Sequence, residues 1–178
     1  ETVQPFLAIR ADLGLTANAA YVLELVDRFT YEEGQNRALY ALLVETLGRL
    51  EAGGDIFIPL RFFELRLLEN AGYRPELHHC VVCSAEIQPQ EQFFSASEGG
   101  VLCPRCGPGT PGVRPVSVEA LRYLRHFQRS RYVEALRARV PAAVRAEVEA
   151  LMQHYLTFLL ERGLNTPGFI RQVGGSAG

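Results

Sequence analysis

The sequence predicts an all-α fold, a helical bundle with an inserted small four-cysteine zinc-binding hairpin module. Apolar residues recur at helical spacing on both sides of a central stretch that is rich in glycine and proline. That stretch also contains every cysteine of the 178-residue chain. We therefore divide the chain into a first bundle segment (residues 1–76), a zinc-binding module (77–112) and a second bundle segment with a tail (113–178).

Two helices are expected early in the first bundle segment. The first carries apolar side chains at three- and four-residue steps: Tyr21, Val22, Leu25, Val26 and Phe29. The second shows the same kind of spacing: Leu39, Leu42, Leu43, Leu47 and Leu50. Gly34-Gln35-Asn36 separates the two helices and Gly53-Gly54-Asp55 ends the second, because these residue types favour turns.

A third helix follows and is expected to lie at the centre of the bundle. It begins either with Asp55 as its cap or nearer Ile58, with Pro59 in its first turn, where a missing backbone N–H costs no hydrogen bond. Its apolar residues occupy more than one face, as in a helix surrounded by others. Gly72 is the expected residue just beyond its C-terminus.

The four cysteines form two C-x-x-C pairs with nineteen residues between them, a spacing typical of a tetrahedral zinc site. The predicted ligands are Cys80, Cys83, Cys103 and Cys106. The residues between the pairs are expected to form a hairpin, with Phe93 and Phe94 on the outgoing arm and Glu98-Gly99-Gly100 in the turn. Four thiolates leave no coordination position for water, so the predicted zinc is structural.

Two disulfides, a redox-active pair and ligation by histidine are the alternatives for this cluster. Nothing in the sequence indicates the oxidising compartment that disulfides require. A redox-active C-x-x-C would need only two of the four cysteines. His78 and His79 directly precede Cys80, but with four thiolates available they are expected to be solvated.

Two further helices are expected in the second bundle segment. Ser117 caps one whose apolar side carries Leu121, Leu124 and Phe127. Pro141 begins a long helix that ends at Gly163. The apolar positions of this last helix recur mostly at steps of three and four residues: Val144, Val148, Leu151, Tyr155, Leu159 and Leu160. Residues 174–178 are expected to be disordered.

Charge is distributed unevenly along the chain, whose net charge is −2. Residues 1–79 carry seven arginines against twelve acids, and residues 114–145 carry eight arginines against two acids. Guanidinium groups bind phosphate oxygens in a bidentate way, so the second region supplies candidate nucleic-acid contacts. These are Arg114, Arg122, Arg125, Arg129, Arg131, Arg137 and Arg139. The alternative is a solvated helix face, or arginines paired with acids of the first region.

No grouping of side chains predicts catalysis. The carboxylates are scattered, His126 and His154 stand alone, and no glycine-rich phosphate-binding loop occurs. No stretch reaches the length of apolar residues that spans a membrane. We therefore expect a non-enzymatic, cytoplasmic protein without a small-molecule substrate.

Several short motifs follow one another in a characteristic order. The order begins with a helical motif, Glu64-Leu65-Arg66-Leu67-Leu68, and continues with Gly72-Tyr73-Arg74-Pro75 and the first cysteine pair. It ends with Gly99-Gly100-Val101-Leu102-Cys103, which leads into the second cysteine pair. The earlier segment Leu23-Glu24-Leu25-Val26-Asp27-Arg28 completes the set. In this order and spacing the motifs resemble the C-terminal part of RecO, a bacterial family of recombination mediators, over nearly all of the chain.

The resemblance implies a function that spacing alone does not. RecO proteins carry an N-terminal OB-fold ahead of this region, and we expect that domain to be absent here. RecO proteins bind single- and double-stranded DNA and anneal complementary strands. With RecR, they help to load RecA onto DNA coated by single-strand-binding protein (SSB). The C-terminal tail of SSB is a further expected partner. The resemblance thus implies a nucleoid-associated DNA-repair mediator. The alternative is a zinc-stabilised protein–protein adaptor without DNA binding of its own.

Overall fold

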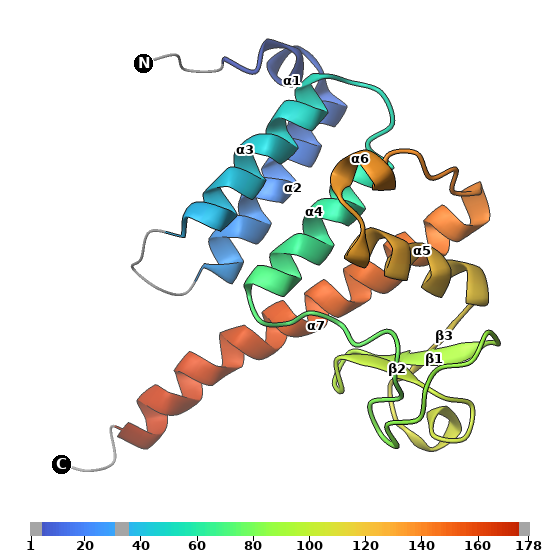
Figure 1. Cartoon of the computed structure of the whole chain (residues 1–178). Coiled ribbons are helices and arrows are strands. Elements are labelled where there is room, and N and C mark those ends of the chain that lie inside the picture. Colours follow the sequence, from blue (N-terminus) through green and yellow to red (C-terminus); the bar gives the residue numbers. More distant parts are fainter. Residues whose placement is uncertain (1–4, 31–35, 175–178) are drawn as a thin grey trace. The chain divides into compact units, whose positions relative to one another are not determined.

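Figure 1 shows the computed structural model of the chain, which describes residues 5–30 and 36–174, with side chains as far as residue 162. The chain is mostly helical and divides into two compact units. One comprises residues 1–75 and 122–145, the other residues 76–121 and 146–178. Within the described ranges, no helix carries an apolar stretch long enough to cross a membrane. The three-segment division at residues 76 and 112 remains a prediction.

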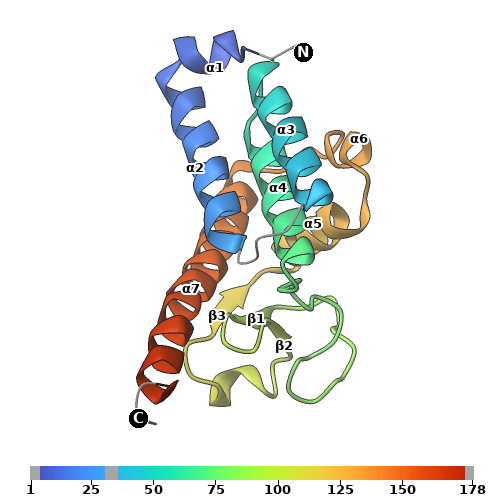
Figure 2. The ribbon, with the colours of Figure 1, turned by 90° about the vertical axis from the view of Figure 1, so that its left-hand side faces the viewer.

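The first unit contains three long helices, α2 (Leu13–Phe29), α3 (Arg37–Glu51) and α4 (Phe57–Asn70). They lie side by side in Figures 1 and 2, after a short helix α1 (Leu7–Ala11) that the sequence does not predict. The three predicted helices are thus confirmed. Gly34 and Gln35 lie outside the described residues, but the Asn36 side chain caps α3 by accepting a hydrogen bond from Leu39 N at 3.0 Å.

Helix α4 is the central helix of this unit, as its apolar pattern predicts. Every side chain from Phe57 to Leu65 is buried, although the run includes Arg61 and Glu64. The helix begins at Phe57 with Ile56 as its N-cap, so Pro59 lies in the first turn and the start nearer Ile58 is the better of the two predictions. Asp55 is not the cap residue, although its side chain accepts a hydrogen bond from Phe57 N at 3.0 Å.

The C-terminus of α4 is a Schellman motif built around Gly72. Gly72 has a positive φ of 80° and donates to Glu69 O at 3.2 Å, while Tyr73 N donates to Leu68 O at 2.7 Å. A left-handed conformation favours glycine because it has no Cβ, so Gly72 ends the helix as predicted.

The rest of the first unit is built around α6 (Tyr132–Ala135), a short helix that the sequence does not predict. It follows α5 (Val118–Arg129), of which residues 122–129 belong to this unit. The Arg49 guanidinium lies 3.7 Å from the centre of the Tyr132 ring, and Arg66 donates to Ser130 O at 2.8 Å. These contacts hold α6 against α3 and α4.

The second unit contains the predicted hairpin and one strand more. Strands β1 (Gln92–Ser95) and β2 (Gly100–Leu102) pair antiparallel, with Phe94 opposite Val101, and Gly99 in the turn has a φ of 73°. Strand β3 (Arg114–Val116) pairs with the other edge of β1, giving the order β2-β1-β3. The all-α prediction is therefore only roughly right. Pro115 is tolerated because β3 is an edge strand.

The long helix α7 (Ala142–Gly174) contributes its residues from Ala146 onward to the second unit. The Tyr155 ring meets Phe94 of β1 edge to face, with centroids 5.3 Å apart, and both side chains are buried. The expected end at Gly163 is wrong, since a glycine inside a helix costs only about 1 kcal/mol relative to alanine and does not break it. Residues 175–178 lie outside the described ranges.

Candidate metal centre and nucleic-acid interface

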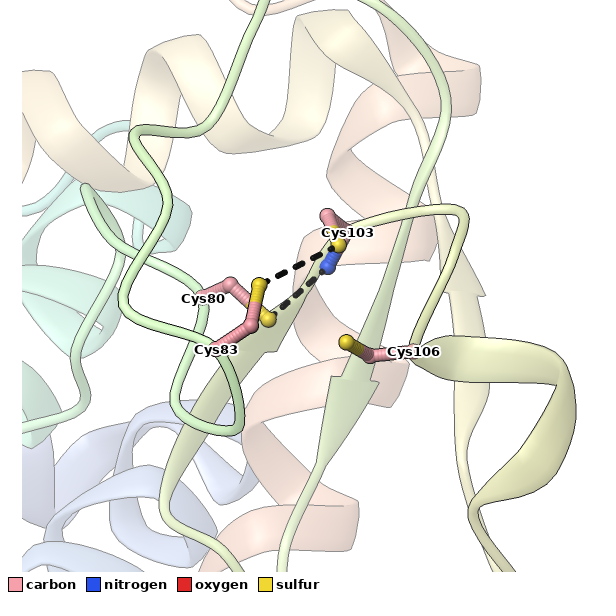
Figure 3. Close-up of side chains that lie close together, drawn as sticks. All are labelled: Cys80, Cys83, Cys103 and Cys106. Carbon is pink, nitrogen blue, oxygen red and sulfur yellow. Dashed lines mark hydrogen bonds between the residues drawn. The ribbon is translucent and has the colours of Figure 1, made fainter.

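The four cysteines come from two turns at one end of the hairpin, and their side chains point toward one another (Figure 3). Cys80 and Cys83 belong to a turn closed by hydrogen bonds from Ser84 N to Cys80 O and from Cys80 N to Ala85 O, both at 2.8 Å. Cys103 directly follows β2, and Cys106 N donates to Cys103 O at 3.0 Å. Each C-x-x-C pair therefore forms a turn with both sulfur atoms on its inner side.

The sulfur positions fit a tetrahedral metal ion. All four Sγ atoms lie within 4.8 Å of one another, and the Sγ atoms of Cys83 and Cys103 are 3.7 Å apart. A zinc ion with Zn–S bonds of about 2.3 Å places its sulfur ligands about 3.8 Å apart. The cluster includes neither His78 nor His79. The chain thus holds four thiol ligands in a zinc-compatible arrangement, while the identity of the metal remains a prediction.

The peptide backbone around the cluster prepares the inner cysteines for metal binding. Burial disfavours ionisation of Cys80, but backbone N–H groups, that of Cys103 foremost, outweigh it and lower the pKa of Cys80 to about 6. Burial also opposes ionisation of Cys103, whose pKa is lowered by backbone N–H groups, first that of Cys106. Hydrogen bonding to Cys103 raises the pKa of Cys106 to about 12. A cation is therefore needed to hold all four thiolates together.

The site has a buried side and an exposed side. Cys80 and Cys103 are buried, Cys83 is exposed, and Cys106 is half-buried. The turn after Cys106 packs tightly on the sheet: a Cβ atom added to Gly107 would lie 2.1 Å from the Phe93 ring. Only a glycine fits at this position, so the contact with β1 fixes the second turn.

The predicted DNA-binding arginines of α5 are not equivalent. Arg122 and Arg129 are exposed, whereas Arg125 is half-buried. Arg131 precedes α6, and Arg137 and Arg139 follow it; all three are exposed. Within the part of the chain that the structure describes, Arg122, Arg129, Arg131, Arg137 and Arg139 form no ion pair with an acid. Their role in binding DNA remains a prediction.

Arg114 belongs to the second unit and has a different environment. It is the first residue of β3 and borders a cavity of about 330 Å³ that Pro115, Glu147, Ala150 and Leu151 also line. Burial lowers the pKa of His154, and the positive charge of Arg114 lowers it further. Both effects disfavour the protonated form of His154, and His154 does not belong to the cysteine cluster.

The aromatic residues of the basic segment make contacts within the protein, and one of them, Phe127, lies in the core. Phe127 is fully buried, and Tyr132 packs edge to face on Phe62 with centroids 5.3 Å apart. The Tyr123 hydroxyl donates to Arg139 O at 2.6 Å. Tyr123 therefore holds the backbone at Arg139.

Sequence reasoning missed the acid that anchors the start of α5. Glu147 of α7 accepts hydrogen bonds from Ser117 N and Ser117 Oγ, both at 2.6 Å. Ser117 also caps α5 as predicted, because its Oγ accepts from Ala120 N at 3.1 Å. No local pattern could have identified Glu147, since the two partners are thirty positions apart.

Comparison with known proteins agrees with the motifs. The family model described as "Recombination protein O C terminal" matches residues 10–167. The DNA repair protein RecO of Dehalococcoides mccartyi strain BAV1 is 36% identical over 91% of this chain and 64% of its own length. That of Roseiflexus sp. strain RS-1 is 38% identical over 94% of this chain and 59% of its own. The RecO of Bacillus pumilus is 35% identical over 97% of this chain and 67% of its own.

This chain therefore spans less than two thirds of the length of the first of these relatives. The family match nevertheless covers most of the chain and the whole cysteine module, and the relatives share more than 30% of its residues. On these grounds the chain belongs to the RecO family of DNA repair proteins.

Proposed function

We propose that this chain is a non-enzymatic mediator of DNA repair and recombination that binds DNA through the arginines of α5 and of the segment around α6. The supporting observation is the set of five exposed arginines without an ion-pair partner among the described residues, in a chain of the RecO family. Contacts from arginine to phosphate carry no sequence information, which suits a protein that acts on any DNA.

The family suggests the biological setting. We propose that the protein supports strand annealing and, with RecR, the loading of RecA onto SSB-coated single-stranded DNA, in the bacterial cytoplasm at the nucleoid. A pull-down with RecR, with SSB and with SSB lacking its tail tests these partners. Capture of neither protein would argue against this setting.

The zinc is proposed to be structural. Four cysteines complete a tetrahedral shell, so no position remains for an activated water or a substrate atom. The Tyr155–Phe94 contact and the buried strand residues Val101 and Val116 indicate that apolar packing also stabilises the module.

Fluorescence anisotropy with labelled single- and double-stranded DNA tests DNA binding directly. We expect the logarithm of the binding constant to fall linearly with the logarithm of the salt concentration. Combined replacement of Arg122, Arg129, Arg137 and Arg139 by glutamine should weaken binding and flatten this slope by about one for each lost phosphate contact. Arg125 is left unchanged because it is half-buried.

Arg28→Gln is the matched control, since Arg28 is an exposed arginine of the acidic region that pairs with Glu24 at 3.0 Å. It should leave DNA affinity unchanged. If the unmodified chain binds no DNA even at low salt, the protein–protein adaptor is the better description. If the fourfold variant binds as tightly as the control, these arginines are not the DNA surface.

A further inference from the structure

Two apolar side chains project into solvent, one from α6 and one from its C-cap residue. Val133 is 64% exposed and Leu136 is 52% exposed. They are three positions apart in a helical stretch, so they lie on the same face. Together the two side chains form a small apolar contact surface.

The segment that carries this pair is firmly anchored. Ala135 and Val140 are buried, and the backbone on either side is bound by side chains of other helices. Arg66 of α4 donates to Ser130 O at 2.8 Å, and Tyr123 of α5 donates to Arg139 O at 2.6 Å. The exposed pair is therefore presented in a fixed conformation, and a partner that binds it has little ordering entropy to overcome.

Positive charge surrounds the pair. Arg131 precedes it and Arg137 and Arg139 follow it, all of them exposed. Glu134 is the sole acid between Arg131 and Arg139, and its carboxylate accepts a hydrogen bond from Arg131 N at 2.9 Å. The matching partner must combine negative charge with exposed apolar surface.

We propose that α6 binds unstacked bases of single-stranded DNA, with Val133 and Leu136 packed on base faces and the flanking arginines on the phosphates. This inference rests on the proposed DNA binding and specifies the form of DNA. A single strand offers base faces beside its phosphates, whereas a duplex hides them in the stack. Exposed arginines also occur on α5, at Arg122 and Arg129, so a strand that continues past α6 would find further phosphate contacts.

The test is the double variant Val133→Ser/Leu136→Ser in the whole chain. Anisotropy is measured with fluorescein-labelled oligothymidylate and with a duplex of equal length. We expect a loss of affinity for the single strand of about tenfold, a loss for the duplex of less than about twofold, and an unchanged salt slope. Because both side chains are exposed, the melting temperature should not change. Leu23→Ser, at an exposed leucine of α2, is the matched control and should bind like the unmodified chain.

The outcomes separate this inference from the proposed function. If the unmodified chain binds neither form of DNA, the proposed function and this inference both fail. If it binds both forms and the double variant binds single strands equally well, only the inference is overturned. Equal losses of affinity for the single strand and the duplex would also overturn it. The binding of an acidic, apolar peptide is measured in parallel. If the double variant binds DNA normally but no longer binds this peptide, α6 is a protein-binding surface and the inference is wrong.

Discussion

Arg145 and Asp55 form a bidentate ion pair across 90 sequence positions. Arg145 Nη1 donates to Asp55 Oδ1 at 2.8 Å and Nη2 donates to Oδ2, while Nε donates to Val140 O at 3.0 Å. Asp55 also accepts from Phe57 N at the start of α4. The pair thus joins the first turn of α7 to the residue that lies two positions before α4. This ion pair distinguishes Arg145 from the arginines proposed to bind DNA.

Arg145→Met is expected to lower the free energy of unfolding by up to about 1 kcal/mol near neutral pH, the upper range for a partly exposed pair. The hydrogen bond from Arg145 is the largest cause that lowers the pKa of Asp55. A carboxylate whose pKa is lower in the folded than in the unfolded chain stabilises the fold at pH values above its unfolded-state pKa, about 3.9 for aspartate. This stabilisation is lost as the pH falls through the pKa of the folded state. The difference between variant and unmodified chain should therefore shrink in acid, as measured by urea denaturation.

Arg137→Met is the control for this prediction, because Arg137 is exposed and forms no ion pair within the described part of the chain. It should change the free energy of unfolding by less than about 0.5 kcal/mol. A loss for Arg145→Met that is the same in acid as at neutral pH would show that the ion pair is not its cause.

A buried carboxylate at the centre of the first unit leads to the second prediction. Glu64 is fully buried and accepts hydrogen bonds from Tyr21 Oη and Arg61 Nη2, both at 2.6 Å. Tyr21→Phe removes a hydrogen bond to a charged acceptor, so the free energy of unfolding should fall by about 1.5–3 kcal/mol. Tyr40→Phe, at a tyrosine that is 69% exposed, should have no effect in the same denaturation experiment. Equal stability of the two variants would contradict this account.

Local patterns sufficed for the helices of the first unit and for the cluster of four cysteines. Helices α2 to α4 follow apolar spacing that a helix requires, and Gly72 and Asn36 act by local chemistry at helix ends. The hairpin likewise follows from glycines in the turn and from the spacing of the cysteines. In each case the residues that decide the structure are close together in the sequence.

Features that depend on distant residues could not be predicted. Strand β3 has three residues, too few for an alternating pattern, and it exists because β1 offers a free edge. Arg61 and Glu64 are spaced like a surface ion pair, yet α4 buries both. Arg145 is indistinguishable in sequence from the other arginines of its region, and only the fold pairs it with Asp55.

Two neighbouring glycines give a matched pair of variants for the metal module. A Cβ atom on Gly107 would overlap the Phe93 ring at 2.1 Å, whereas one on Gly109 would meet no atom within 4 Å. Gly107→Ala should therefore destabilise the chain by about 1–3 kcal/mol or more, as overpacking does, and should speed the loss of zinc to a chelator. Gly109→Ala should resemble the unmodified chain in both measurements. Similar zinc release from the two variants would show that the turn tolerates displacement from β1.

The cysteine cluster predicts the zinc content of the chain. The purified chain should contain about one zinc ion, measured by elemental analysis, because four thiolates within 4.8 Å of one another form a complete tetrahedral set. Cys80→Ser should abolish binding, since it removes a buried ligand whose thiolate the backbone N–H of Cys103 stabilises. Loss of the metal should also lower the melting temperature, because the free energy of zinc binding contributes to folding.

His78→Ala and His79→Ala decide between four-cysteine ligation and the alternative in which a histidine replaces a cysteine. Both histidines are exposed and lie outside the cluster of sulfur atoms, so each variant should retain the full zinc content. Loss of zinc from either variant would assign that histidine to the site. A folded, unchelated chain with almost no zinc would instead leave apolar packing, such as that between Phe94 and Tyr155, as the main source of the module's stability.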